Sequence, residues 1–301
     1  MIYTNFSKLK FKFGIDLAGD NVVWIAGSGR SGTSWLANSI NHKNDFRYIF
    51  EPLNPNFLEQ NQSDIDWFPH VQQKHGLLES IVLGKISNAW VNSRNRNFFA
   101  RKRLVKSIRS NLMIPWINRN FPNVKVVIIN RNPLAVAASR KALANRGKGN
   151  WIWEPSLEVL LVQNSLKQLL SLDELNKLND QVGGGIVRET VAEWIISNLL
   201  SLKQCDPDHS YRLHYESLVR QDIQVVSGLC NYLGTEDSSG LVKSLSVRSE
   251  TDRNFSQETG CTSPLERWRT ELDENEISWA MEFLESFNLN LIYDSDLEPV
   301  I

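Results

Sequence analysis

The sequence predicts an α/β protein built on a parallel sheet with helices on its faces, and two observations carry that prediction. Short apolar runs typical of strands alternate along the chain with stretches whose apolar residues recur at helical spacing. The strongest run, residues 124–130, is almost continuously β-branched, which is typical of a strand buried on both faces. No shift in composition divides the 301 residues, so we expect a single domain, 1–301.

Charge and cysteine content narrow the classes of partner and location. The 33 basic and 34 acidic residues nearly cancel, so the charge of the whole chain favours neither a nucleic acid nor an anionic membrane as partner. Cys205, Cys230 and Cys261 are far apart and form no metal-binding or disulfide pattern. No apolar run approaches the roughly 18 residues of a membrane span. We therefore expect a reduced, cytoplasmic protein without a transmembrane segment, and we leave its oligomeric state open.

Residues 1–20 form the first segment, an N-terminal arm. In this arm lysines alternate with apolar residues, at Lys8, Leu9, Lys10, Phe11, Lys12 and Phe13. A period of two predicts a short edge strand or a half-buried arm, and it differs from the continuous apolar core of a signal peptide.

A Gly-rich loop follows the strand expected at residues 22–26. Gly27 and Gly32 keep the spacing of the nucleoside-triphosphate loop Gly-x-x-x-x-Gly-Lys-Ser/Thr, and a helical pattern begins at Thr33. Glycines let the backbone approach a ligand, and a helix N-terminus favours an anion, so the loop predicts a phosphate cradle. Thr33 replaces the lysine of that motif and Arg30 is the loop's only cation, which disfavours ordinary triphosphate hydrolysis. A plain Gly/Ser turn is the alternative.

The next strand, residues 46–50, stops at Glu51 because Pro52 cannot continue a ladder. Glu51 is therefore expected at the carboxyl end of a strand, where α/β sheets bind ligands. The irregular residues that follow, 54–97, predict an insertion beside that edge. His70 and His75 lie in it, either as chemical groups or as solvated and hydrogen-bonded loop histidines.

A second phosphate site is suggested where the strand 124–130 ends. Arg131 lies at the lip of that strand, and Asn132 is a good N-cap for the helix that follows. Ser139 falls on the same face of this helix as Asn132. An arginine and a hydroxyl placed in this way can share a phosphate. Taken alone, Arg-Asn-Pro favours a plain strand-to-helix turn.

The remaining elements follow the same alternation. The helices expected are 33–41, 77–91, 112–120, 133–147, 157–178, 187–205 and 216–234, and the further strands are 103–107 and 210–215. A second insertion is expected at 141–190. Its Trp151 and Trp153 either pack under the next helix or stack on a bound sugar.

Taken together, these motifs resemble those of the sulfotransferase family. Arg30-Ser31-Gly32-Thr33-Ser34-Trp35 is similar to the family's 5′-phosphosulfate loop, Arg131 and Ser139 have the eight-residue spacing of its 3′-phosphate motif, and residues 215–218 resemble its Tyr-Glu-Asp-Leu segment. The resemblance covers residues 22–287. It implies a P-loop-like domain with a parallel sheet of about five strands, as in nucleotide kinases, and it implies 3′-phosphoadenosine 5′-phosphosulfate (PAPS) as donor, with no metal. The donor-binding residues it implies are Gly29, Arg30, Ser31, Gly32, Thr33, Ser34, Trp35, Arg131, Ser139 and Tyr215.

The resemblance also implies the reaction, which is transfer of a sulfuryl group to a hydroxyl or amine of a glycan, lipid or small molecule. Arg30 and Lys106 are expected to stabilise charge on the leaving phosphate. Phenol-type members carry a histidine after the third strand where this chain has Ile108, so Glu51 becomes the candidate base. The alternatives for Glu51 are a solvated carboxylate or an ion pair with Arg30 or Lys106. Arg30 and Phe-Glu-Pro favour the carbohydrate-acting branch.

The C-terminal segment matches the family less closely. Arg253, Arg267 and Arg269 are weaker candidates for donor contacts, because the Arg-Lys-Gly triplet of the phenol-type members is absent. Two other classes remain open, a kinase-like phosphotransferase and a catalytically silent nucleotide-binding protein. The insertions 54–97 and 141–190 are expected on the acceptor side.

Overall fold

The computed structural model describes residues 15–58, 64–148, 155–201, 207–235, 237–247, 263–288, 292–294 and 296–300. Its strands are β1 (Ile15–Asp16), β2 (Val22–Ala26), β3 (Phe46–Phe50), β4 (Phe99–Ala100), β5 (Lys102–Ser107), β6 (Lys125–Asn130) and β7 (Ser210–His214). Its helices are α1 (Thr33–Ile40), α2 (Gly76–Val82), α3 (Ile114–Asn120), α4 (Pro133–Leu143), α5 (Leu157–Leu161), α6 (Asn164–Leu169), α7 (Leu172–Asn179), α8 (Ile186–Trp194), α10 (Tyr215–Val219), α11 (Ile223–Leu233), α12 (Ser238–Leu245), α14 (Trp268–Glu271) and α15 (Glu274–Glu285).

Five of the strands form one parallel sheet in the order β3-β5-β2-β6-β7. β2 lies at its centre and is buried along its whole length. β1 and β4 pair in parallel as a separate two-stranded sheet. The predicted fold class, a P-loop-like α/β domain with a parallel sheet of about five strands, is confirmed.

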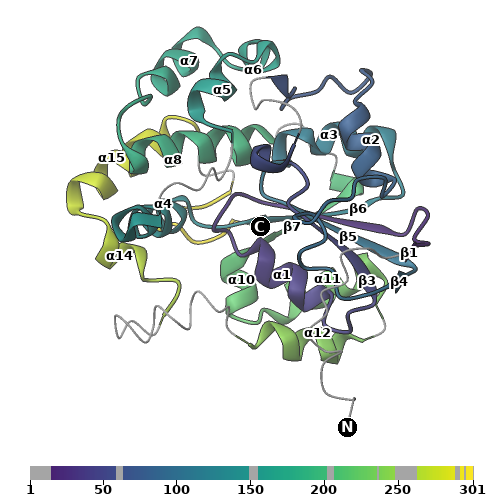
Figure 1. Cartoon of the computed structure of the whole chain (residues 1–301). Helices are drawn as coiled ribbons and strands as arrows, with labels where there is room; N and C mark the ends of the chain where they lie inside the picture. Colours follow the sequence, from purple (N-terminus) through teal and green to yellow (C-terminus); the bar gives the residue numbers. More distant parts are fainter. Residues whose placement is uncertain are drawn as a thin grey trace.

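Alternate residues of the strands feed two cores, one on each face of the sheet. Trp24 and Val126 face the larger core, to which α2, α3, α4 and α8 contribute. Val23 and Val127 face the smaller core, to which α1, α11 and α12 contribute. Figure 1 shows these helices on opposite sides of the strands. The near-continuous apolar character of β6 follows from this arrangement, because both of its faces are covered.

Several expected long helices are divided. The stretch 157–178 forms α5, α6 and α7 instead of one helix, because Ser171 starts α7 in a capping box with Glu174. The helix expected at 216–234 is divided into α10 and α11, where Asp222 caps the second piece. The helix expected at 77–91 ends at Val82. In the first two cases, a side-chain cap starts a new helix inside the stretch that helical periodicity predicted as continuous.

The carboxyl ends of the five parallel strands meet at one edge of the sheet, where β2 leads into the Gly-rich loop. β1 lies at Ile15–Asp16, within the segment 1–20, whereas the alternating residues 8–13 of the expected N-terminal arm lie outside the described residues. Residues 1–14, Trp151, Trp153, Cys205, Arg253 and Cys261 lie outside the described residues. Among the helices that the structure describes, none is long and apolar enough to cross a membrane.

Candidate active site

The Gly-rich loop between β2 and α1 keeps its path through two glycines. Gly32 is left-handed, with a φ of 87°, and a Cβ there would lie 2.6 Å from the Tyr215 ring. A Cβ on Gly27 would lie 2.5 Å from the carbonyl oxygen of Ile129. Among the described residues, no side chain caps the N-terminus of α1, so no capping group there engages its first N–H groups. The loop therefore has the form of the predicted anion cradle.

Arg30 joins the loop to the second predicted phosphate motif. It is left-handed, with a φ of 78°, and its Nε donates to Ser139 Oγ at 2.9 Å. Arg131 donates from one guanidinium nitrogen to the carbonyl oxygen of Arg30 at 2.8 Å. A small pocket at this place is lined by Arg30, Arg131, Ala135, Ala138, Ser139, Pro264, Arg267 and Trp268. The structure thus brings Arg30, Arg131 and Ser139 together, although they are up to 109 residues apart.

Several buried polar atoms lack a hydrogen-bond partner among the described residues, and two of them belong to the predicted phosphate-binding residues. These two are the hydroxyl oxygen of Ser31 and the Nε of Arg131. An unsatisfied buried donor costs free energy unless a ligand satisfies it. Both atoms can donate a hydrogen bond, so a bound oxyanion would satisfy both of them. The observation fits the phosphate groups that the sequence motifs predict.

Tyr215 is a buried residue that packs against Arg131 and Trp35 at this site. It is 3% exposed, the Arg131 guanidinium lies 4.2 Å above its ring centroid, and Trp35 contacts its edge at 5.6 Å between centroids. Trp35 donates from its indole nitrogen to the carbonyl oxygen of Val247 at 3.0 Å. Two other residues of the predicted loop, Thr33 and Ser34, lie in the first turn of α1, where Thr33 is buried and Ser34 is exposed.

A buried charge cluster lies at the ends of β3 and β5. Glu51 is 4% exposed and left-handed, with a φ of 44°. One of its carboxylate oxygens accepts from Lys106 Nζ, and the other accepts from Arg109 at 3.1 Å and from the Ile108 N–H at 3.2 Å. Burial lowers the pKa of Lys106, and the Glu51 carboxylate opposes that shift.

This cluster settles which partner the Glu51 carboxylate takes. Of the two ion pairs considered from the sequence, the one with Lys106 is present, and Arg30 is engaged with Ser139 instead. The sequence reasoning missed Arg109. Its signal was a second cation just after the strand that carries Lys106, at the same sheet edge.

An aromatic group adjoins Glu51. Trp90 donates from its indole nitrogen to the carbonyl oxygen of Glu51 at 3.2 Å. Phe57 stacks on Trp90 with centroids 4.3 Å apart and an interplanar angle of 7°, and Phe57 is 46% exposed. Both residues belong to the insertion 54–97. The insertion therefore places a flat apolar surface beside the candidate base.

The two histidines of that insertion have structural contacts. His75 accepts from the N–H of Leu78 at the start of α2, at 3.4 Å, and packs edge-on against Trp116. His70 is exposed and accepts from the N–H of Gln72 at 3.4 Å. These contacts match the loop-histidine alternative.

Behind Arg131 lies a buried polar network that the sequence did not predict. Glu216 accepts from the N–H of Asn132 at 2.9 Å and from the Tyr293 hydroxyl at 3.1 Å. Burial raises the pKa of Glu216, and it lowers the pKa of the neighbouring His214 to about 4. Because Asn132 follows Arg131 directly, the network holds the strand-to-helix turn that presents Arg131.

Of the C-terminal candidates, Arg267 lines the pocket with Arg30 and Arg131. Arg269 faces Trp268, with its guanidinium 4.3 Å from the ring centroid, and pairs with Glu266 at 2.9 Å. Of the three arginines, Arg267 therefore lies at the candidate site, Arg269 pairs within its own segment, and Arg253 lies outside the described residues.

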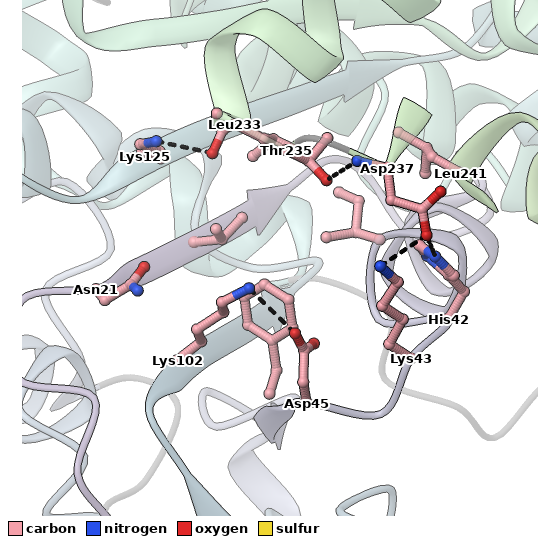
Figure 2. Close-up of a pocket in the computed structure, with 14 residues that line it drawn as sticks. Asn21, His42, Lys43, Asp45, Lys102, Lys125, Leu233, Thr235, Asp237 and Leu241 are labelled. Carbon is pink, nitrogen blue, oxygen red and sulfur yellow. Dashed lines mark hydrogen bonds and ion pairs between the residues drawn. The ribbon is translucent and has the colours of Figure 1, made fainter. Parts of the chain in front are cut away.

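A larger cavity of about 540 Å³ lies at the opposite edge of the sheet, where β2, β3, β5 and β6 begin (Figure 2). Its cationic side chains already have partners within the chain. Lys102 pairs with Asp45 at 3.0 Å, Lys43 and His42 lie 2.8 and 3.2 Å from Asp237, and Lys125 donates to the carbonyl oxygen of Leu233 at 2.8 Å. These contacts hold the starts of the strands against neighbouring helix ends, at the edge of the sheet opposite the Gly-rich loop.

The model of the sulfotransferase family matches residues 23–239, more than two thirds of the sequence, and the chain belongs to that family of enzymes. A search of curated proteins found no match.

Solved structures similar to this chain include three sulfotransferases. The sulfotransferase domain from the curacin biosynthetic pathway is 19% identical, with 90% of this chain and 99% of that chain covered and a TM-score of 0.46. Mouse sulfotransferase SULT7A1 complexed with PAP is 12% identical, with coverage of 93% and 87% and a TM-score of 0.47. The sulfotransferase from Alicyclobacillus acidocaldarius is 17% identical, with coverage of 85% and 98% and a TM-score of 0.39.

Proposed function

We propose that this enzyme transfers a sulfuryl group from PAPS to a hydroxyl or amine acceptor, with a carbohydrate as the favoured acceptor class. The observation that carries the proposal is the pocket in which Arg30, Arg131 and Ser139 meet beside the Gly-rich loop. PAPS brings an activated sulfuryl group on its 5′-phosphate and a second phosphate on its 3′-oxygen. The chain offers a separate set of donors for each phosphate.

The donor side divides between the two phosphates. The loop N–H groups and the hydroxyl of Ser31 would hold the 5′-phosphate, since Ser31 Oγ is buried without a partner among the described residues. Arg131 and Ser139 would hold the 3′-phosphate, and the Nε of Arg131 is the donor left to reach it. The Arg30 side chain donates a hydrogen bond to Ser139, while its backbone is part of the Gly-rich loop. Arg30 can therefore contact either phosphate.

The acceptor side is proposed at the Glu51 cluster. Glu51 would accept the proton of the acceptor, because the carboxylate oxygen that bonds Lys106 keeps a second lone pair. Lys106 would lie between Glu51 and the Gly-rich loop, since its strand β5 is the direct neighbour of β2, which leads into that loop. A cation in this position stabilises charge that develops on the leaving oxygen. Arg109 and the Ile108 N–H would hold the Glu51 carboxylate in place.

The carbohydrate assignment rests on the surface beside Glu51. The exposed Phe57 ring, stacked on Trp90, offers the flat apolar face against which the C–H face of a sugar ring can pack. The insertions 54–97 and 141–190 are part of this proposal as acceptor-side segments. A cytoplasmic location and independence of metal also remain proposals. The structure describes no group of three or more His, Cys, Asp or Glu residues suited to a metal ion within its described ranges.

Transfer of labelled sulfate from PAPS tests the function directly. The full-length enzyme is incubated with panels of glycan, lipid, peptide and phenol acceptors, with magnesium and with a chelator. We expect labelled product on a glycan in both conditions. A requirement for magnesium and a nucleoside triphosphate would show a kinase-like enzyme, and nucleotide binding without turnover on any panel would show a silent binding protein. Turnover on phenols alone would overturn the carbohydrate assignment.

A further inference from the structure

Four apolar side chains remain exposed around the two-stranded sheet of β1 and β4. They are Ile15 (46% exposed), Leu17 (59%), Phe98 (41%) and Phe99 (60%). The backbone joins them, since the Ile15 N–H donates to the carbonyl oxygen of Phe98 at 2.6 Å and the Leu17 N–H donates to that of Ala100 at 2.8 Å. Together they are called the edge patch. In Figure 1 the strands β1 and β4 lie at the right-hand edge, far from α4 and α14.

Strand alternation explains why the edge patch is exposed. Asp16 points inward, where its carboxylate pairs with Arg47 at 2.8 Å and Arg103 at 2.7 Å. Ile15 and Leu17, one residue to either side, therefore point outward. Phe99 is in register with Ile15, and Ala100 is in register with Asp16 and is 1% exposed. The buried ion pairs thus fix which face is apolar and exposed.

The chain segments that adjoin the edge patch are rich in basic residues. Residues 94–103 contain five basic residues and no acidic one. Lys102 and Arg103 pair with Asp45 and Asp16. The other three, Arg94, Arg96 and Arg101, are exposed, and none forms an ion pair with a carboxylate in the part of the chain that the structure describes. In the sequence, three lysines also lie just before Ile15, at Lys8, Lys10 and Lys12. The near-neutral charge of the whole chain hides this local excess.

We propose that the edge patch, with Arg96 and Arg101, binds the surface of an anionic lipid bilayer. Exposed phenylalanine, leucine and isoleucine side chains gain free energy when they enter the headgroup boundary, and the arginines gain from anionic headgroups. A second copy of this chain would bring a second set of arginines against the first, which is unfavourable. A nucleic acid would satisfy the arginines, but its phosphate backbone would leave the aliphatic side chains uncovered. The bilayer is the partner that satisfies both.

The test is sedimentation of the full-length protein with vesicles of phosphatidylcholine that contain about 30% phosphatidylserine, compared with vesicles of phosphatidylcholine alone. We expect binding to the anionic vesicles, weakened by added salt. The double variant Arg96→Gln/Arg101→Gln should bind about 25-fold more weakly, at about fivefold for each charge. Phe99→Ser should weaken binding at least tenfold. Phe99 and Arg101 lie outside the proposed active site and its acceptor-side insertions, so Phe99→Ser and the single variant Arg101→Gln should leave sulfuryl transfer to a water-soluble acceptor unchanged.

Matched controls are Leu172→Ser and Arg119→Gln, which remove an exposed apolar and an exposed basic side chain elsewhere. Both controls should bind as the wild type does, and circular dichroism checks that every variant is folded. Equal binding to both kinds of vesicle, no binding to either, or an equal loss in the controls would overturn the proposal. A dimer in gel filtration that Phe99→Ser dissociates would assign the edge patch to self-association instead. Tighter binding to an oligonucleotide than to anionic vesicles would assign it to nucleic acid.

Discussion

Removal of Arg131 should abolish the preference of this enzyme for a nucleotide with a 3′-phosphate. The wild type should bind adenosine 3′,5′-bisphosphate more tightly than 5′-AMP, because only the former reaches the pocket of Arg131 and Ser139. One guanidinium nitrogen of Arg131 bonds the Arg30 carbonyl at 2.8 Å, and its buried Nε has no partner among the described residues. Loss of a charge-assisted hydrogen bond of this kind costs about 1.5–3 kcal/mol, which corresponds to about a tenfold to hundredfold loss of affinity.

Calorimetric titration of both nucleotides into wild type and Arg131→Ala measures this preference. Because Arg131 also holds the loop through the Arg30 carbonyl, a second variant is needed that leaves that bond intact. Ser139→Ala removes the hydroxyl and its bond to Arg30 Nε but leaves the bond between Arg131 and the Arg30 carbonyl, and it should reduce the preference about threefold to tenfold. Arg188→Ala is the control. It removes an arginine of α8 whose guanidinium faces the Trp279 ring, and it should leave the affinity for both nucleotides unchanged. Equal affinity of the wild type for the two nucleotides would refute the reasoning.

Four further predictions follow from single positions. Arg30→Ala should lower kcat more than it raises the KM for the donor, since charge on the leaving oxygen grows in the transition state; a change in KM alone would make Arg30 a binding residue only. Glu51→Gln should lower kcat about 10²- to 10⁴-fold with nucleotide affinity retained, and near-normal turnover would leave Glu51 a positioning residue for Lys106. Gly32→Ala should lower the thermal midpoint more than Gly183→Ala does, because both glycines are left-handed but only a Cβ at Gly32 meets a side chain, that of Tyr215; equal shifts would contradict the clash. The pKa of His214 is lowered to about 4, so the stability it contributes is present above about pH 6.5 and is lost as the pH falls toward 4, and His214→Asn should reduce the acid loss of unfolding free energy by up to about 1.4 kcal/mol per pH unit; parallel curves for variant and wild type would contradict this.

Much of the donor side was predictable because its signals are local. Gly27, Gly32 and Thr33 identify the loop through spacing alone, and Asn132 identifies the turn that places Arg131 through its capping preference. The cap is present as expected, with the Asn132 side chain accepting from the N–H groups of Leu134 and Ala135. Such features depend on backbone conformation over a few residues, which a sequence pattern expresses directly.

The partners of charged groups were not predictable in the same way. The Glu51 carboxylate takes Lys106 and Arg109, which are more than fifty residues away, and Arg30 turns to Ser139. The Tyr293 hydroxyl reaches Glu216 from the C-terminal segment across 77 residues. Periodicity places each side chain on a face of its own element, but it does not say which elements lie side by side.

The sequence by itself determined the α/β class and the family resemblance, and it predicted an anion-binding loop and a second phosphate motif, because each depends on short-range spacing. The tertiary structure alone decided that Glu51 is an ion-paired carboxylate next to an aromatic surface, and that the basic stretch 94–103 divides into buried pairs and exposed arginines. Strand order and packing bring distant residues into contact, and burial then sets which charges must find partners within the chain.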